Sequence, residues 1–144
     1  MKNNHYFKIE APESDYLYTR ESQIQLAGQG LFTAILIHRN EIISVFKGEV
    51  LSAREAKLRA EKGENRYFIQ LLNGKIMDSA NTPCFAKYAN DAGNETGFKN
   101  NAEITLDDRN RVCLVAKRTI KPGEEIFCSY GSSYWKGLTA DQKK

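Results

Sequence analysis

Glycines and polar side chains gather in four short segments that could bind a small molecule. The first is Gly28-Gln29-Gly30, which is followed by an apolar run typical of a strand. Two glycines at this spacing let the backbone approach a ligand closely, although a tight turn or bulge at the start of a strand is the plainer interpretation. No helix pattern and no third glycine follow, so the pair does not match a dinucleotide-binding fingerprint. The other segments are Phe46–Leu51, Phe85–Ala92 and Ile120–Gly131, with Tyr134-Trp135 just beyond.

Side chains that bind metals or act as nucleophiles are few and scattered. The cysteines are Cys84, Cys113 and Cys128, an odd number, and no two of them have the C-x-x-C spacing of a zinc site. The two histidines, His5 and His38, lie far apart in the sequence. The sequence therefore argues against a metal site, a disulfide framework and a cysteine nucleophile. Unpaired thiols are typical of a reducing, intracellular compartment, either nucleus or cytoplasm.

Short strands and one helix must position these segments. Ser52 and Glu55 form a capping-box pattern at the start of the helix, Gly63 suits its end, and Arg59 has the i,i+4 spacing for an ion pair with Glu55. Asn73-Gly74 predicts a hairpin, because both residues tolerate positive φ. Apolar and β-branched runs predict strands at Tyr16–Thr19, Leu31–Ile37, Glu41–Phe46, Arg66–Leu72, Lys75–Asp78, Asn101–Leu106, Arg111–Ala116 and Glu125–Tyr130. The chain is therefore expected to be mostly β, with long irregular connections.

Length and charge limit the classes of protein that remain. The 144 residues suit one ordinary domain, and the net charge of +3 is spread over 21 basic and 18 acidic residues. This weak bias argues against nucleic acid as the main partner. The longest apolar run, Leu31–Ile37, has strand length and is far shorter than the ~20 residues of a membrane-spanning helix. Charged residues make up 27% of the chain, so we expect a soluble protein without a membrane partner. No secretory signal is predicted at the N-terminus.

The order of the segments resembles that of the SET-domain protein lysine methyltransferases. That family has a G-x-G, then an R-F-x-N-H-S-type segment and finally a G-E-E-[LI]-x-x-x-Y-G segment, which correspond here to Gly28–Gly30, Lys87–Ala92 and Gly123–Gly131. The last segment is the most specific of the three. The resemblance implies an N-terminal strand or extension over residues 1–22, a minimal SET domain over 23–135 and a short tail over 136–144.

The resemblance also implies a fold and a reaction. The fold is β-clip-like, with several small sheets, one short helix and a C-terminal pseudoknot in which Tyr130 passes beneath the loop Lys87–Ala92. The cofactor is S-adenosylmethionine, bound on one face, and the substrate is a protein lysine that enters from the other face through a narrow channel. A histone tail is a family-level candidate for that substrate. The cysteine-rich zinc segments that flank many members have no counterpart in this sequence, so no metal is expected.

Roles for single residues follow from the same resemblance. Tyr130 corresponds to the catalytic tyrosine, whose hydroxyl orients the amine and the methyl group. Asn90 suits the cofactor site because an amide offers donors and an acceptor without charge. The residues implied for the cofactor are Gly28, Gln29, Gly30, Leu31, Lys87, Tyr88, Asn90, Asp91 and Trp135. Those implied for the lysine channel, where aromatic rings can hold an ammonium by cation–π contact, are Tyr67, Phe68, Cys128 and Tyr134.

Several positions depart from the family pattern and leave alternatives open. Asp91 stands where the family has histidine, Lys87 replaces an arginine, and Cys128 is small where many members have Phe or Tyr. Phe68 could equally serve core packing, and Trp135 could either cover the adenine or fix the C-terminus. The alternative functions are a catalytically weak or inactive SET-fold module for protein interaction and a small β scaffold without a cofactor. A homodimer is compatible with the sequence, although no apolar helical seam predicts one.

Overall fold

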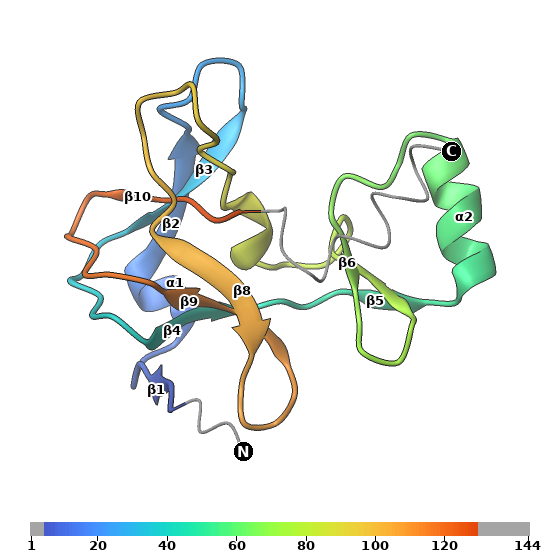
Figure 1. The fold of residues 1–144 in the computed structure, drawn as a ribbon, viewed down its shortest axis with the longest axis horizontal. Coiled ribbons are helices and arrows are strands. Elements are labelled where there is room, and N and C mark those ends of the chain that lie inside the picture. The colour runs from blue at the N-terminus through green and yellow to red at the C-terminus, as the bar shows by residue number, and fades with distance from the viewer. Residues whose placement is uncertain (1–4, 130–144) are drawn as a thin grey trace.

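The computed structural model describes residues 5–129 of the chain, and these fold into small β-sheets with short helices between them (Figure 1). The elements are β1 (Phe7–Lys8), α1 (Glu13–Tyr16), β2 (Leu17–Glu21), β3 (Gln29–Thr33), β4 (Glu41–Val45), β5 (Glu49–Leu51), α2 (Ala53–Glu61), β6 (Phe68–Gln70), β7 (Ile76–Asp78), the 3-10 helix Ala86–Tyr88, β8 (Ala102–Leu106), β9 (Val112–Ala116) and β10 (Glu125–Ile126). The mostly β fold of several small sheets is confirmed. The described residues hold two α-helices rather than one, because α1 is a single turn after Pro12 and too short for a helical pattern to reveal it.

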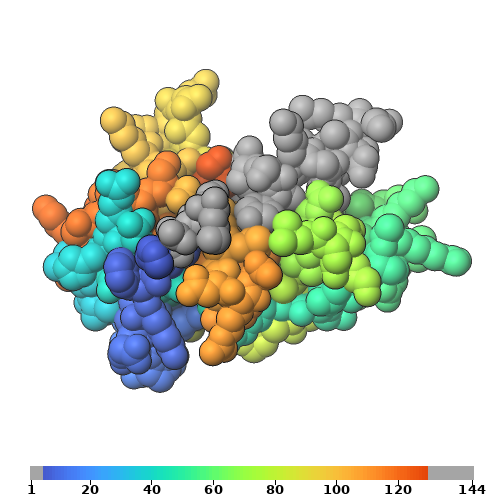
Figure 2. Space-filling view, turned by 60° about the horizontal axis from the view of Figure 1, so that its bottom comes forward, coloured from blue at the N-terminus to red at the C-terminus, as the bar shows by residue number. Residues whose placement is uncertain are grey.

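The strands form three sheets. A four-stranded sheet has the order β1-β4-β9-β8, a three-stranded sheet has the order β10-β3-β2, and a second three-stranded sheet has the order β5-β7-β6. All neighbours are antiparallel except β1 and β4, which run parallel. We call residues 49–78, which carry the β5-β7-β6 sheet and α2, the insert; it lies to one side of the other two sheets (Figure 1). On another face, the β8–β9 hairpin lies between the N-terminal residues and the insert (Figure 2).

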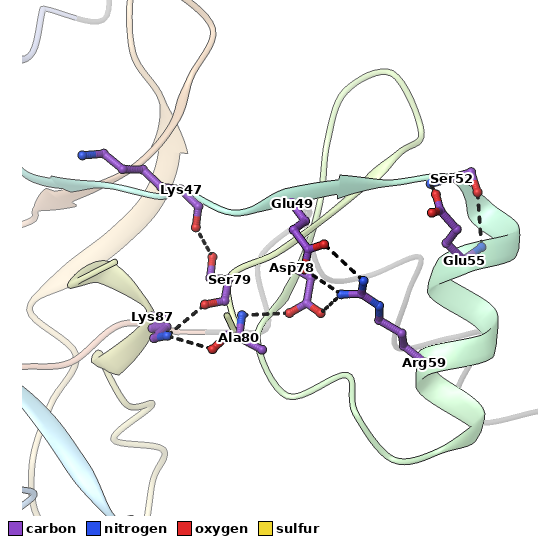
Figure 3. A network of polar contacts seen from close by, with 9 residues as sticks. All are labelled: Lys47, Glu49, Ser52, Glu55, Arg59, Asp78, Ser79, Ala80 and Lys87. Carbon is purple, nitrogen blue, oxygen red and sulfur yellow. Dashed lines mark hydrogen bonds and ion pairs between the residues drawn. The ribbon is translucent and has the colours of Figure 1, made fainter. Parts of the chain in front are cut away.

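Two separate hydrophobic clusters support this arrangement. The large cluster joins the two sheets outside the insert and includes Leu31, Ile43, Leu114 and Ile126. Every residue of β9 is buried, as expected for a strand between two neighbours with both faces covered. The small cluster lies within the insert and contains Leu51, Ala56, Phe68 and Ile76. The insert is also joined to the large cluster through Ile69 of β6. Polar contacts among the residues that flank it, Lys47, Ser79 and Lys87, add to this packing (Figure 3).

Strand β3 ends at Thr33, four residues before the predicted end at Ile37. The Thr33 hydroxyl donates to the carbonyl of Ile35 at 2.8 Å and accepts from its N–H at 3.1 Å, which turns the chain out of the strand. Ile37 instead forms an isolated antiparallel bridge with Ile120. None of the helices among residues 5–129 is long and apolar enough to cross a membrane.

Helix α2 has the predicted ends but a different ion pair. The Ser52 hydroxyl accepts from the Glu55 N–H at 3.2 Å and the Glu55 carboxylate accepts from the Ser52 N–H at 2.9 Å, so the capping box is confirmed. Gly63 follows the helix with φ +76°. Arg59 does not pair with Glu55 as predicted: its guanidinium donates to Asp78 at 2.8 Å and to Glu49 at 3.0 Å. Asp78 is buried, so it gains more from a cation than the exposed Glu55 does.

Candidate active site

A cavity of about 300 Å³ lies where three segments far apart in the sequence meet. Its wall is formed by the loop from β2 into β3, by the residues before β6, and by the 3-10 helix with the loop after it. The lining residues are Gly28, Gln29, Arg66, Tyr67, Lys87, Tyr88 and Asn90. Five of the residues predicted for the cofactor therefore share one cavity, together with Tyr67, which was predicted for the lysine channel. Arg66 was not predicted, and its only sequence signal is that it precedes Tyr67.

The two glycines of the G-x-G segment serve different purposes. Gly28 has φ +79°, a conformation that costs a side-chain-bearing residue free energy, and nothing closer than 3.9 Å would meet a Cβ there. Gly30 does not have positive φ, but a Cβ at that position would overlap Oε2 of Glu125 and lie 2.9 Å from its Cδ. The first glycine is thus required by backbone conformation and the second by space.

Glu125 on β10 fixes the loop that carries Gly28 by accepting hydrogen bonds from it. Its carboxylate is 2% exposed, accepts from the Ser22 hydroxyl at 2.6 Å and accepts from the backbone N–H of Gln23 at 2.8 Å. The Ser22 N–H in turn donates to the Gly28 carbonyl at 2.8 Å. Sequence reasoning missed this role, although Glu125 is the second glutamate of the Gly-Glu-Glu segment. A buried carboxylate with hydrogen-bond partners about a hundred residues away holds one wall of the cavity in place.

Asn90 links the cavity to the strand that leads toward Tyr130. Its side-chain amide donates to the Gln29 carbonyl at 3.0 Å, and its own carbonyl accepts from the Cys128 N–H at 2.9 Å. Asn90 forms a parallel bridge with Phe127, while Ala102 forms one with Cys128. The chain at residues 127–128 therefore runs between two segments that come earlier in the sequence. Tyr130 itself lies outside the described residues.

The ammonium of Lys87 is surrounded by backbone carbonyls. It donates to Ser79 O at 2.8 Å and to Ala80 O at 3.3 Å (Figure 3). It also donates to Thr82 O at 3.3 Å. It also lies 5.2 Å from the ring centroid of Tyr67 and 5.3 Å from that of Tyr88. Lys87 thus joins the 3-10 helix to the turn after β7 and holds two aromatic walls of the cavity together.

Other predicted site residues do not line this cavity. Leu31 is fully buried in the large cluster, one residue beyond Gly30. Asp91 accepts through Oδ1 from the Gly93 N–H at 2.9 Å and from the Asn100 amide at 3.1 Å, so its carboxylate shapes the turn after Asn90. Neither side chain is therefore presented to a ligand in the cavity.

The predicted channel residues separate into three groups. Tyr67 lines the cavity, whereas Phe68 is fully buried in the small cluster of the insert, the placement that its core-packing alternative describes. Cys128 is also fully buried, and burial together with the negative charge of Asp91 raises the pKa of its thiol, so the sulfur stays neutral. Tyr134 lies outside the described residues, as does Trp135 from the cofactor group.

Comparisons with known proteins point to one family. A family model for the SET domain matches residues 28–131. The Histone-lysine N-methyltransferase trr of Drosophila melanogaster is 27% identical over 133 residues, which cover 90% of this chain and 5% of that protein. A histone-lysine N-methyltransferase of Candida albicans, described as H3 lysine-36 specific, is 28% identical over 120 residues, which cover 80% of this chain and 14% of that protein.

A solved structure shows the same fold. It is a humanized mutant of the Chaetomium thermophilum Polycomb Repressive Complex 2 bound to the inhibitor GSK126, with a TM-score of 0.68 and 28% identity, and the match covers 82% of this chain and 15% of that one. This chain thus spans only a small part of the length of the proteins it matches. The family model covers most of the chain, including the G-x-G segment and Asn90. The chain therefore belongs to the SET-domain family.

Proposed function

We propose that this SET domain transfers a methyl group from S-adenosylmethionine to the ε-amine of a protein lysine. The observation that carries the proposal is the meeting of Gly28, Tyr67 and Asn90 at one cavity, beside the strand that leads to Tyr130. A histone is the proposed substrate class, because the relatives carry names that refer to histone lysines. The three cysteines are free and buried, which suits the reducing intracellular compartment where such a substrate would be met.

The cavity residues fit this cofactor. Gly28 exposes backbone without a Cβ, and Asn90 fixes the peptide at Gln29, so polar backbone groups can meet the amino-acid part of the ligand. Tyr67 and Tyr88 present aromatic rings 6.4 Å apart, which suit a cationic or planar group. When bound, S-adenosylmethionine supplies an activated methyl group on a sulfonium. The chain's own residues must then bind, orient and exclude water.

The protein must also favour a neutral lysine amine. A lysine with an ordinary pKa of ~10.4 needs roughly 4–5 kcal/mol to reach the neutral form at pH 7. Removal from water lowers that cost, as do nearby positive charges, because both disfavour an ammonium. Such a charge would come from the sulfonium of a bound S-adenosylmethionine. No strong base is needed, and the thiol of Cys128 is not one, since its raised pKa keeps it protonated.

Tyr130 is the proposed catalytic residue, with its hydroxyl orienting the amine. In the sequence only Ser129 separates it from Cys128, whose backbone N–H donates a hydrogen bond to the Asn90 carbonyl. Cys128 and Tyr134 are proposed for the lysine channel and Trp135 for the cofactor side. A second candidate function, a SET-fold interaction module with weak or no catalysis, is favoured by one observation: the carboxylate of Asp91, at the family's histidine position, bonds within its own turn.

Two measurements test the proposal. Isothermal titration of the purified chain with S-adenosylmethionine should show binding, and tritiated methyl transfer to histones or to a cell lysate should be detectable. Tyr130→Phe should lower the transfer rate by a factor of order 100, the usual scale for losing one positioned hydrogen-bond donor, while leaving cofactor binding intact. Tyr18→Phe is the matched control, since the ring of Tyr18 stacks on Phe32 and does not line the cavity. Binding without transfer to any protein would favour the interaction module, and absence of binding would reject both.

A further inference from the structure

We propose that Arg66 binds the carboxylate of the cofactor's amino-acid part, and that Lys87, although it stands at the family's arginine position, is a positioning residue. The inference rests on the proposed function, because it concerns the same cavity. It goes further by naming which charged group of this chain recognises the ligand. Arg66 belongs to none of the three segments that carry the family resemblance.

Lys87 has no N–H left for a ligand. An ammonium has three donors, and those of Lys87 point to three backbone carbonyls at 2.8, 3.3 and 3.3 Å. Two of these carbonyls belong to Ser79 and Ala80, directly after the insert, and the hydroxyl of Ser79 also donates to the Lys47 carbonyl (Figure 3). Withdrawing the ammonium toward a ligand would break contacts that join the turn after β7 to the 3-10 helix.

Arg66, by contrast, has donors to spare. A guanidinium carries five N–H groups, and the hydrogen bond found for Arg66 is a long one, 3.5 Å from Nη2 to the Ala27 carbonyl. Its carbon Cζ lies 5.3 Å from the ring centroid of Tyr67, and Nη2 lies 3.9 Å from where a Cβ of Gly28 would be. The side chain is exposed, and among residues 5–129 no carboxylate forms an ion pair with it. The guanidinium therefore stands beside the G-x-G backbone with most of its donors unused.

The charge of the cavity selects the part of the ligand that Arg66 would meet. The described lining contains two cationic side chains, Arg66 and Lys87, and no acidic one. S-adenosylmethionine carries one negative group, the carboxylate, and two positive ones, the ammonium and the sulfonium. Only the carboxylate is attracted to this wall, and a planar guanidinium can bind it through two parallel hydrogen bonds.

The test compares two ligands that differ in the amino-acid part, which carries the carboxylate. S-adenosylhomocysteine carries the amino-acid part, whereas 5′-methylthioadenosine keeps the adenosine and the sulfur but lacks it. Isothermal titration would be run on the wild-type chain, on Arg66→Gln and on Arg54→Gln. The last is a matched control, an exposed arginine on α2 whose loss changes the net charge equally. We expect Arg66→Gln to weaken S-adenosylhomocysteine binding roughly tenfold or more, the scale of one charge-assisted hydrogen bond.

The same variant should bind 5′-methylthioadenosine as the wild type does, and Arg66→Lys should regain part of the lost affinity. Lys87→Met should lower the melting temperature but keep the affinity ratio of the two ligands. Equal binding of S-adenosylhomocysteine by wild type and Arg66→Gln would overturn the inference alone and leave the proposed function standing. Equal losses for both ligands would also overturn it. A wild-type chain that binds neither S-adenosylmethionine nor S-adenosylhomocysteine would overturn the inference together with the proposed function.

Discussion

Gly30→Ala should destabilise the protein because the added methyl group meets a buried carboxylate. The new Cβ would overlap Oε2 of Glu125, lie 2.9 Å from its Cδ and lie 3.2 Å from the Cα of Ser22. The contacting atom of Ser22 is a backbone atom, so movement of a flexible side chain cannot relieve the strain on that side. Either the Glu125 carboxylate moves away from its partners or β3 and the loop that carries Ser22 separate.

The size of the effect follows from these contacts. Overpacking of a tight site costs about 1–3 kcal/mol, and a hydrogen bond to a charged group contributes about 1.5–3 kcal/mol. Glu125 would lose its contact with the Ser22 hydroxyl, now 2.6 Å long, or with the Gln23 N–H, now 2.8 Å long. We therefore expect the free energy of unfolding to fall by about 3 kcal/mol, which lowers the melting temperature by about 10 °C in a domain of this size.

A double-mutant cycle makes the test specific. Urea unfolding followed by circular dichroism would be measured for Gly30→Ala, Glu125→Ala and the double variant. Removing the carboxylate opens space for the new methyl group, so the two changes should be non-additive, with a coupling of about 2 kcal/mol. Glu125→Gln is the matched control, because it keeps the bulk of the side chain and should not rescue Gly30→Ala. Additive free energies within about 0.5 kcal/mol would refute the steric explanation.

Three further changes test other parts of the structure. Arg59→Met should lower the melting temperature, because it leaves the carboxylate of Asp78 buried without its cation, and Arg54→Met should have little effect. Lys87→Met should lower the melting temperature, since three carbonyls lose their donor, and an unchanged melting temperature would contradict that role. Asp107→Asn tests pH dependence: burial acts to raise the pKa of Asp107, but hydrogen bonds from Arg111 and the Arg109 N–H outweigh it, and the pKa is lowered. The stability that this carboxylate contributes is present above its unfolded pKa of ~3.9 and is lost as the pH falls through the lower folded value. The free energies of unfolding of wild type and Asp107→Asn, measured by urea unfolding, should therefore differ at pH 7 and converge near pH 2.

Local signals were the part of the fold that sequence could predict. The capping box at Ser52 and Glu55 depends on residues three positions apart, and it forms as expected. The hairpin at Asn73-Gly74 also forms, although only Gly74 has positive φ, so the turn is wider than a two-residue loop. In each case neighbouring residues carry the whole physical reason, and no distant contact overrides it.

Partners from distant parts of the chain could not be predicted in this way. Arg59 has a suitable glutamate, Glu55, one helical turn away, yet it pairs with Asp78. Asp78 lies on β7, which pairs with β5, and its buried carboxylate needs a cation more than an exposed glutamate does. The hydrogen bond between Glu125 and Ser22 joins residues 103 positions apart, and no local pattern marks either of them as its end. Arg66 was missed for a related reason: it lies outside the family segments, and only the fold brings it beside Gly28.

The candidate site is held together by side chains that hydrogen-bond to neighbouring loops, which we call tethers, rather than by one rigid element. Glu125 holds the connection that carries Gly28, Asn90 holds the Gln29 peptide, and Lys87 holds the turn that follows the insert. Each tether joins a side chain to groups on another segment, so the walls of the cavity depend on the register of strands that do not touch a ligand. A substitution at a tether should therefore alter stability and ligand affinity together, whereas one at Arg66 should alter affinity alone. Measuring both stability and affinity therefore distinguishes the residues that shape the cavity from Arg66, which we propose binds the ligand.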